Sequence, residues 1–243
     1  MNNELNTVHD WLCSNKLSLN TEKTEFIVFH ATGKKVTEID IKIKNNAIKR
    51  VTKTKFLGVT IHENLKWTFH INNVCSRVAS SIGVIRRLSN VFSAKVLRML
   101  YNALVLPIIS YANIVWGFGR TCAIKNIHIL QKRAVRTIGN VGYRDHHDTP
   151  PLFKMLDIMP IFDIYNMQLG IFMYRLINNL LPKTVNYPIV YNYAVHDYST
   201  RSASSLRNTK PRTEMRKTCI QYSGISLWNS LPSYIKQSYL GHL

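Results

Sequence analysis

The spacing of apolar residues changes along the chain, from a period of two in much of the first quarter to a period of 3.6 farther on. The start of the chain is an exception. Leu5, Val8 and Leu12 lie three and four residues apart and predict an amphipathic helix. Trp11 widens the apolar face of that helix, and we expect the face to pack on the strands that follow.

Several short segments after this helix have the pattern of strands. Residues 39–44 alternate strictly between apolar and charged side chains, which is typical of a strand buried on one face, and Asn45-Asn46 can supply the turn after it. The other expected strands cover residues 24–30, 47–51 and 55–61. The pattern predicts a small antiparallel sheet with one helix against it.

Beyond the strands the pattern becomes helical. A first long helix has one apolar stripe, while Arg77, Arg86 and Arg87 fall outside it. The stripe consists of Ile71, Val74, Val78, Ile82, Ile85 and Leu88. Ser93 is the expected N-cap of a second helix, which Pro107 should end or kink.

A third helix is expected over residues 123–138, and its polar face is basic. Lys125, Lys132 and Arg136 are separated by seven and four residues and therefore line up on one side. Arg133 lies beside them. The positions expected to face inward are Ile124, Ile127, Leu130, Ala134 and Ile138. The Gly-Asn pair that follows suits a C-terminal cap.

The rest of the chain is expected to be a long helix and then a mostly irregular tail. Residues 160–181 are apolar over so much of their surface that we expect this helix to pack between others. The tail from Asn186 is rich in tyrosine and arginine, which either stack on bases and reach phosphates or pack across a helical surface. Trp228 is expected to anchor a short final helix. The predicted fold is α+β, predominantly α.

Charge is concentrated in the middle of the chain. The 243 residues are 46% hydrophobic, ample for a core, and carry 32 basic against 13 acidic side chains, a net charge of +19. Residues 63–143 hold 11 basic side chains, and Glu63 is their only acid. Because a solvated helical face usually mixes both signs, this segment favours binding to phosphates, with nucleic acid as the leading partner.

Other chemistry is sparse. The four cysteines form no Cys-x-x-Cys pair, so neither a zinc site nor a disulfide framework is indicated, and an intracellular location, nucleus or cytoplasm, is expected. Residues 145–148, Asp-His-His-Asp, contain metal-ligand types but are interpreted as a linker because Thr149-Pro150-Pro151 follows. The most apolar stretch, residues 103–118, is too short to span a membrane, and no membrane partner is expected. Hydrolase elbows and phosphate-binding glycine loops are absent from the sequence.

A series of short motifs runs in order from residue 5 to residue 236. They are Trp11, Asn15-Lys16-Leu17-Ser18-Leu19-Asn20, Lys23-Thr24, Phe26 to Phe29, Phe56-Leu57-Gly58-Val59-Thr60-Ile61, Leu65-Lys66-Trp67, His70-Ile71, Leu100-Tyr101, Leu106-Pro107, Tyr111, Trp116-Gly117, Leu130-Gln131-Lys132-Arg133 and Leu227-Trp228-Asn229-Ser230-Leu231-Pro232. Their order and spacing resemble the end of the palm and the thumb of jockey-like non-LTR retrotransposon reverse transcriptases.

The resemblance implies four parts and an activity for the parent enzyme. Residues 1–66 would be the end of the palm with a primer-grip hairpin, and residues 67–143 a helical thumb bundle. Residues 144–185 would be a linker and a long apolar helix, and residues 186–243 a basic, aromatic-rich extension. The parent activity would be RNA-templated DNA synthesis, with RNA template and DNA primer as partners.

The resemblance also implies roles for particular residues. Lys23 matches a palm lysine that protonates pyrophosphate or stabilises its charge, and the alternative is a surface lysine beside a strand. Gly58 would let a hairpin backbone approach the primer end, and the alternative is an ordinary strand bulge. The remaining primer-grip residues are Lys53, Lys55, Phe56, Leu57 and Val59. The thumb residues that would hold phosphates without reading sequence are Lys125, Lys132, Arg133 and Arg136.

The catalytic carboxylates of that family do not occur in this chain. Two-metal polymerisation needs carboxylates that converge on two ions about 3.5–4 Å apart. In the family a Phe/Tyr-Ala-Asp-Asp turn stands upstream of the tryptophan equivalent to Trp11, whereas this chain begins at Met1 without it. We therefore expect no metal or cofactor in this chain, with Mg²⁺ serving the intact parent enzyme, and a requirement for the missing N-terminal part of the polymerase.

Two other functions stay open at the level of sequence. The chain could be a non-enzymatic helical RNA- or DNA-binding module with thumb-like helices. It could also be a structural protein whose charge serves solubility, in which case binding to an RNA/DNA hybrid would be absent or insensitive to salt.

Overall fold

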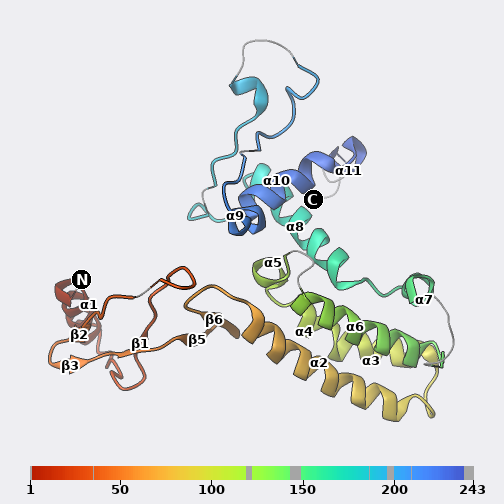
Figure 1. The fold of residues 1–243 in the computed structure, drawn as a ribbon, viewed down its shortest axis with the longest axis horizontal. Coiled ribbons are helices and arrows are strands. Elements are labelled where there is room, and N and C mark those ends of the chain that lie inside the picture. The colour runs from red at the N-terminus through yellow and green to blue at the C-terminus, as the bar shows by residue number, and fades with distance from the viewer. Residues whose placement is uncertain are drawn as a thin grey trace. The chain divides into compact units, whose positions relative to one another are not determined.

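The computed structural model describes residues 2–34, 36–118, 122–142, 149–185, 187–195, 200–208 and 210–237. The predicted Asp-His-His-Asp linker at 145–148 lies outside them. The chain divides into two compact units, Met1–Asn73 and Val74–Leu243. Helices predominate and the strands are short, which confirms an α+β fold that is mostly α (Figure 1).

The first unit contains one helix and three separate strand pairs. Helix α1 covers Asn2–Ser14. The strands are β1 Glu25–Phe26, β2 Lys42–Ile43, β3 Asn46–Ala47, β4 Lys49–Arg50, β5 Lys53–Phe56 and β6 Val59–His62. Strand β2 pairs with β3 and β5 with β6, both antiparallel, whereas β1 pairs with β4 in parallel. The prediction of one antiparallel sheet was therefore wrong, because pairing partners depend on contacts distant in sequence that local alternation does not encode.

Helix α1 and the β2–β3 hairpin share a small apolar core. Ile41, Ile43 and Ile48 are buried, with Leu5, Leu19 and Phe26 packed against them. The hairpin turn is Lys44-Asn45, one residue earlier than predicted, with Lys44 at φ 53°. Its position follows from α1, since the Lys44 backbone N–H donates to Asn6 Oδ1 at 2.7 Å and Lys44 Nζ lies 2.8 Å from Asp10 Oδ1.

Part of the apolar face of α1 has no cover within its unit. Leu5 is half-buried against the isoleucine core, which confirms that the helix packs on the strands. Val8 and Trp11, however, are 54% and 61% exposed. The expected stripe is thus divided into a buried half and an exposed half.

The second unit is helical. Helix α2 covers Thr68–Leu88 and begins before the division between the units; α3 covers Ala94–Leu104, α4 Leu106–Ser110, α5 Asn113–Trp116, α6 Cys122–Ile138, α7 Thr149–Met155 and α8 Ile161–Ile177. The predicted α2 stripe is confirmed, with its first five members buried and Leu88 half-buried. Pro107 stands in the first turn of α4, just after α3 ends, as predicted. None of the described helices is long and apolar enough to cross a membrane.

Asparagine residues end two of these helices. Asn140 follows α6 at φ 51°, and the Val141 N–H donates to the Arg136 carbonyl at 3.0 Å, so the predicted cap is confirmed with Asn140 in the left-handed position. Asn179 adopts φ 56° after α8, and the Leu180 N–H donates to the Arg175 carbonyl at 2.8 Å. This second cap explains why α8 stops at Ile177, short of the predicted 181.

Between α8 and residue 213 the described residues are irregular apart from a short 3₁₀ turn, η1, over Asn192–Ala194. Helices α9 Glu214–Thr218, α10 Ile220–Ser230 and α11 Ser233–Gln237 then follow. Gly224 of α10 faces Met173 of α8 so closely that an added Cβ would lie 2.6 Å from the sulfur. Trp228 is only half-buried, whereas its neighbour Asn229 bonds to both backbone groups of Leu206 in the irregular segment.

Candidate nucleic-acid interface

A basic groove lies between α2 and α6 in the second unit. It encloses about 980 Å³. Its basic side chains are Arg86 from α2 and Lys132, Arg133 and Arg136 from α6. Apolar side chains, among them Ile82, Ile129 and Leu130, also line its walls. Four cations therefore line one hollow whose walls also include apolar side chains.

The structure brings together three of the four cations predicted for this helix face. Lys132, Arg133 and Arg136 line the groove, whereas Lys125 is exposed elsewhere on α6 and is not among the lining residues. Arg86 was noted in the sequence only as a residue outside the α2 stripe. Helical spacing on one element could not show that α2 would present it to α6.

Three of these cations have no acidic partner among the described residues. No acid occurs in the sequence between Glu63 and Asp145. Within the first unit, Glu63 lies 3.1 Å from the Arg50 guanidinium and 3.4 Å from His30 Nε2. Arg86, Lys132 and Arg133 make no ion pair with any acid in the described part of the chain. Three cations without a described acidic partner thus line one hollow, an arrangement that suits phosphate groups.

Gly83 leaves the α2 wall of the groove open. It lies in the interior of the helix, where glycine costs about 0.5–1 kcal/mol relative to alanine. A Cβ added at this position would meet nothing within 4 Å. The position can therefore take a larger side chain that points into free space beside Arg86.

A tight hairpin forms a second candidate surface, in the first unit. Strands β5 and β6 pair from Lys53↔His62 to Phe56↔Val59, so Leu57 and Gly58 alone make the turn. Both have positive φ, 45° and 83°, which is the pattern of a type I′ turn. Among the predicted grip residues, Val59 is buried, while Phe56 and Leu57 are 63% and 73% exposed.

One face of the hairpin combines cations with aromatic rings. Lys53 and Lys55 are exposed on the same face of β5, and the Lys53 ammonium lies 5.5 Å from the centroid of the Phe69 ring. His62 stacks on Phe69 with ring centroids 4.9 Å apart. The Thr60 N–H donates to His70 Nδ1 at 3.2 Å and so fixes the outer edge of β6 to the start of α2.

Lys23 lies in a surface turn before β1. Its backbone N–H donates to Asn20 Oδ1 at 3.1 Å, and the Thr24 hydroxyl donates to the Asn20 carbonyl at 2.8 Å. The Lys23 side chain is exposed and forms no hydrogen bond or ion pair with another described residue. Within the described part of the chain, no three His, Cys, Asp or Glu side chains come together as a possible metal site.

Comparison with known proteins gives one informative likeness. The chain is 26% identical over 142 residues to a protein of Drosophila melanogaster described as "Probable RNA-directed DNA polymerase from transposon BS". This supports an origin related to transposon reverse transcriptases. The match covers 57% of this chain but 16% of that protein, so the chain spans only a small part of its relative. No family model and no solved structure matches the chain.

Proposed function

We propose that this chain is a part of a retrotransposon RNA-directed DNA polymerase that holds the RNA template and DNA primer through phosphate contacts. The observation that carries the proposal is the groove lined by Arg86, Lys132, Arg133 and Arg136. Cations that contact phosphate oxygens bind duplexes of any sequence, as a processive polymerase requires. The likeness to a transposon polymerase supports an RNA/DNA hybrid as the partner.

In this proposal the four segments keep the roles that the resemblance implies. Residues 1–66 form the end of the palm, 67–143 the thumb, 144–185 a linker and helix, and 186–243 an extension. The groove then belongs to the thumb and the β5–β6 hairpin to the primer grip. Lys125 contacts phosphates outside the groove, since it is exposed on α6.

The hairpin supports a primer-side role through its turn. Gly58 has no side chain and adopts φ 83°, so the backbone of the turn can come close to a strand end. Lys53 and Lys55 are available for phosphates on one face, and the exposed Phe56 and Leu57 offer apolar contact with a sugar or base.

In this proposal, nucleotide addition requires other parts of the polymerase. Lys23 acts on the departing pyrophosphate only when the palm carboxylates and their Mg²⁺ ions are supplied by a segment outside this sequence. The chain alone should therefore bind a primer–template without extending it. Such a protein acts inside the cell, in the nucleus or cytoplasm.

A set of substitutions at Gly83 tests the groove with little risk to folding. Gly83→Glu, Gly83→Gln and Gly83→Lys all add a side chain where a Cβ has free space, and all should stabilise α2. The affinity for a dye-labelled RNA/DNA hybrid should fall for Glu, change little for Gln and rise for Lys. The ordering follows the charge added beside Arg86, because phosphates are repelled by a carboxylate and attracted by an ammonium.

Salt dependence supplies the second arm of that experiment. Alanine at Lys132 or at Arg133 should lower the slope of log affinity against log salt by about 0.9 for each phosphate that the variant no longer neutralises. An equal affinity for all three Gly83 variants, or binding that does not weaken as salt rises, would contradict the groove as the phosphate site. Primer extension by the isolated chain with Mg²⁺ would contradict the proposal that its catalytic centre is elsewhere.

A further inference from the structure

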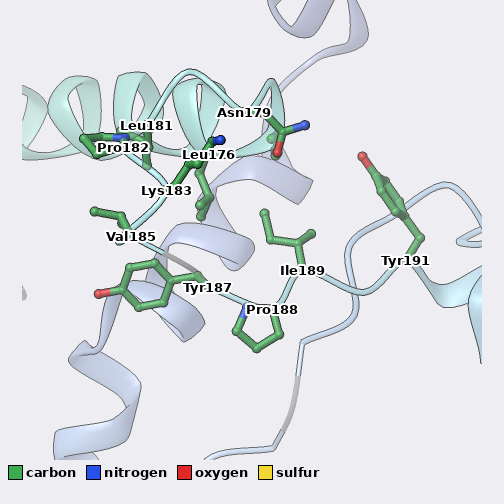
Figure 2. A pocket seen from close by; sticks show the side chains of 11 residues that line it. Leu176, Asn179, Leu181, Pro182, Lys183, Val185, Tyr187, Pro188, Ile189 and Tyr191 are labelled. Carbon is green, nitrogen blue, oxygen red and sulfur yellow. The ribbon is translucent and has the colours of Figure 1, made fainter.

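The C-terminal unit contains a pocket at the end of α8, separate from the basic groove. The end of α8, the turn after it and residues 187–191 surround about 630 Å³. Figure 2 shows Leu176 and Ile189 on facing sides of this space, and Tyr191 at one end with its hydroxyl directed toward Asn179. A volume of this size is within the range of small-ligand sites.

A stacked pair of tyrosines fixes the aromatic wall of the pocket. The rings of Tyr191 and Tyr193 have centroids 5.2 Å apart and planes inclined by 16°. Backbone bonds hold this segment, since the Asn192 N–H donates to the Ser205 carbonyl at 3.0 Å and the Tyr193 N–H to the Ala203 carbonyl at 3.1 Å. Tyr191 is thus backed by a second ring and presented to the pocket in one orientation.

The polar groups at the pocket have no other described partner. The side chains of Asn179, Lys183 and Tyr191 form no hydrogen bond or ion pair with any residue that the structure describes. An amide, an ammonium and a phenol hydroxyl around apolar walls match the parts of a nucleotide. The amide can pair with a base edge, the ammonium with a phosphate and the ring with the base face.

The surroundings of the pocket favour a chain of nucleotides over a single small molecule. A neighbouring hollow shares Leu176, Tyr187, Pro188 and Ile189 with it. Arg207 and Arg216 line that hollow and are exposed. These two cations can contact the phosphates that continue from a bound base along a nucleic-acid strand. A free nucleoside has no such phosphates.

We infer that this pocket binds an unpaired nucleotide of single-stranded nucleic acid, with the base stacked on Tyr191 and a phosphate near Lys183. The choice of ligand rests on the proposed nucleic-acid function, and the inference adds a single-strand site to the duplex-binding groove. A polymerase that copies RNA meets such a single strand in the part of the template that is not yet paired.

Variants at Tyr191 test the inference in the full chain, with short dye-labelled oligo(U) and oligo(A) as single-strand probes and a blunt RNA/DNA hybrid as the duplex probe. Tyr191→Ala should weaken single-strand binding about tenfold or more, as expected when one base stack is removed. Tyr191→Trp should retain it. Hybrid binding should stay within about twofold in both variants, which also shows that they fold. Tyr234→Ala, at a tyrosine that is 68% exposed on α11, is the matched control and should change neither affinity.

The outcomes separate this site from the groove. Unchanged single-strand binding in Tyr191→Ala, or an equal fall for both probes, overturns the inference. Loss of single-strand binding in Tyr191→Trp as well overturns the stacking role. If the hybrid does not bind while oligonucleotide binding depends on Tyr191, the proposed groove function fails and the pocket stands. If Gly83→Glu weakens hybrid binding and Tyr191→Ala changes nothing, the proposed groove function stands and the pocket inference fails.

Discussion

The side-chain amide of Gln131 donates a hydrogen bond from Nε2 to the hydroxyl oxygen of Tyr101 at 2.8 Å. The same amide group donates to the Met159 carbonyl at 3.2 Å and accepts from the Ile161 N–H at 2.8 Å. Gln131 and Tyr101 are buried, and the three bonds connect α6 with α3 and with the start of α8. One polar side chain thus fixes α6, which carries three of the groove cations, to α3 and to the start of α8.

Replacing Gln131 by methionine should destabilise the second unit strongly. The apolar side chain keeps much of the volume but leaves two buried groups, the Ile161 N–H and the Tyr101 hydroxyl, without this partner, at about 1–3 kcal/mol for each. We expect a loss of about 2–4 kcal/mol in the free energy of unfolding, measured by urea denaturation. Lys125→Met, on the exposed side of the same helix, is the control and should stay within about 0.5 kcal/mol of the parent chain. A similar loss in both variants would mean that the amide network has no special weight.

Because of Tyr101, the free energy of unfolding of the second unit should fall as the pH rises in the alkaline range. Burial raises the pKa of Tyr101 from its usual 10 to about 12, although the Gln131 hydrogen bond partly opposes that rise. The folded state therefore binds the phenol proton more tightly than the unfolded state. This contribution is complete below pH 10 and is lost as pH rises toward 12. Two pKa units correspond to about 2–3 kcal/mol.

Comparison with Tyr101→Phe isolates this contribution, because lysines and other tyrosines titrate in the same range. Urea midpoints measured between pH 9 and pH 12 should fall more steeply for the parent chain than for the phenylalanine variant. Parallel curves would show that Tyr101 ionises as easily in the folded protein as in the unfolded one. Phe also removes the hydroxyl that accepts from Gln131, so only the slopes, and not the absolute midpoints, carry the comparison.

Sequence pattern predicted the apolar contacts of the helices better than their polar ones. The α2 stripe from Ile71 to Ile85 was predicted because burial follows the 3.6 period directly. On α6 the same rule placed Leu130 inward, but Leu130 is half-buried and Gln131 is fully buried. Burial of a glutamine can be predicted only once its hydrogen-bond partners are known, and these lie thirty residues away on each side.

The two candidate surfaces show a similar limit. The order of motifs predicted Gly58 in a tight hairpin, but residues 55–61 had the pattern of one continuous strand. The turn was hidden because Leu57, which adopts φ 45°, is not a residue type that signals a left-handed turn. In the groove, Lys132, Arg133 and Arg136 followed from spacing, whereas Arg86 required the packing of α2 beside α6.

The hairpin turn offers a test that separates its stability from its binding role. Leu57→Asn should stabilise the first unit by about 0.5–1 kcal/mol, because asparagine tolerates positive φ and Asn-Gly is favoured in type I′ turns. It should at the same time weaken RNA/DNA hybrid binding if the exposed leucine contacts the primer. Gly58→Ala should destabilise by about 1 kcal/mol or more, because φ 83° strains any side chain.

Thermal unfolding and hybrid affinity measured on both hairpin variants give the result. Higher stability with lower affinity in Leu57→Asn supports the primer-grip proposal. Higher stability with unchanged affinity indicates that the leucine does not touch nucleic acid. Lower stability in Leu57→Asn would contradict the left-handed conformation itself.

Asn229 should hold the irregular segment around Leu206 against α10. Its Oδ1 accepts from the Leu206 N–H at 3.0 Å and its Nδ2 donates to the Leu206 carbonyl at 2.8 Å, and Leu206 is only 2% exposed. Asn229→Asp retains the acceptor but not the donor, whereas Asn229→Ala loses both. Hydrogen exchange around residues 203–207 should rise modestly for Asp and more for Ala. Ser230→Ala on the exposed side of α10 is the control.

The exposed half of the α1 stripe predicts a stability difference between the two units. Val8 and Trp11 are 54% and 61% exposed, and the described strands of this unit form only two-stranded pairs, which are marginally stable alone. Limited proteolysis should therefore remove residues before about Thr68 and spare the helical part. Trp11→Gln should improve solubility without lowering the temperature of unfolding, because an exposed indole contributes little to the core. Cleavage that starts within α3 or α6, or a large fall in unfolding temperature for Trp11→Gln, would show instead that the first unit is stably packed through this helix.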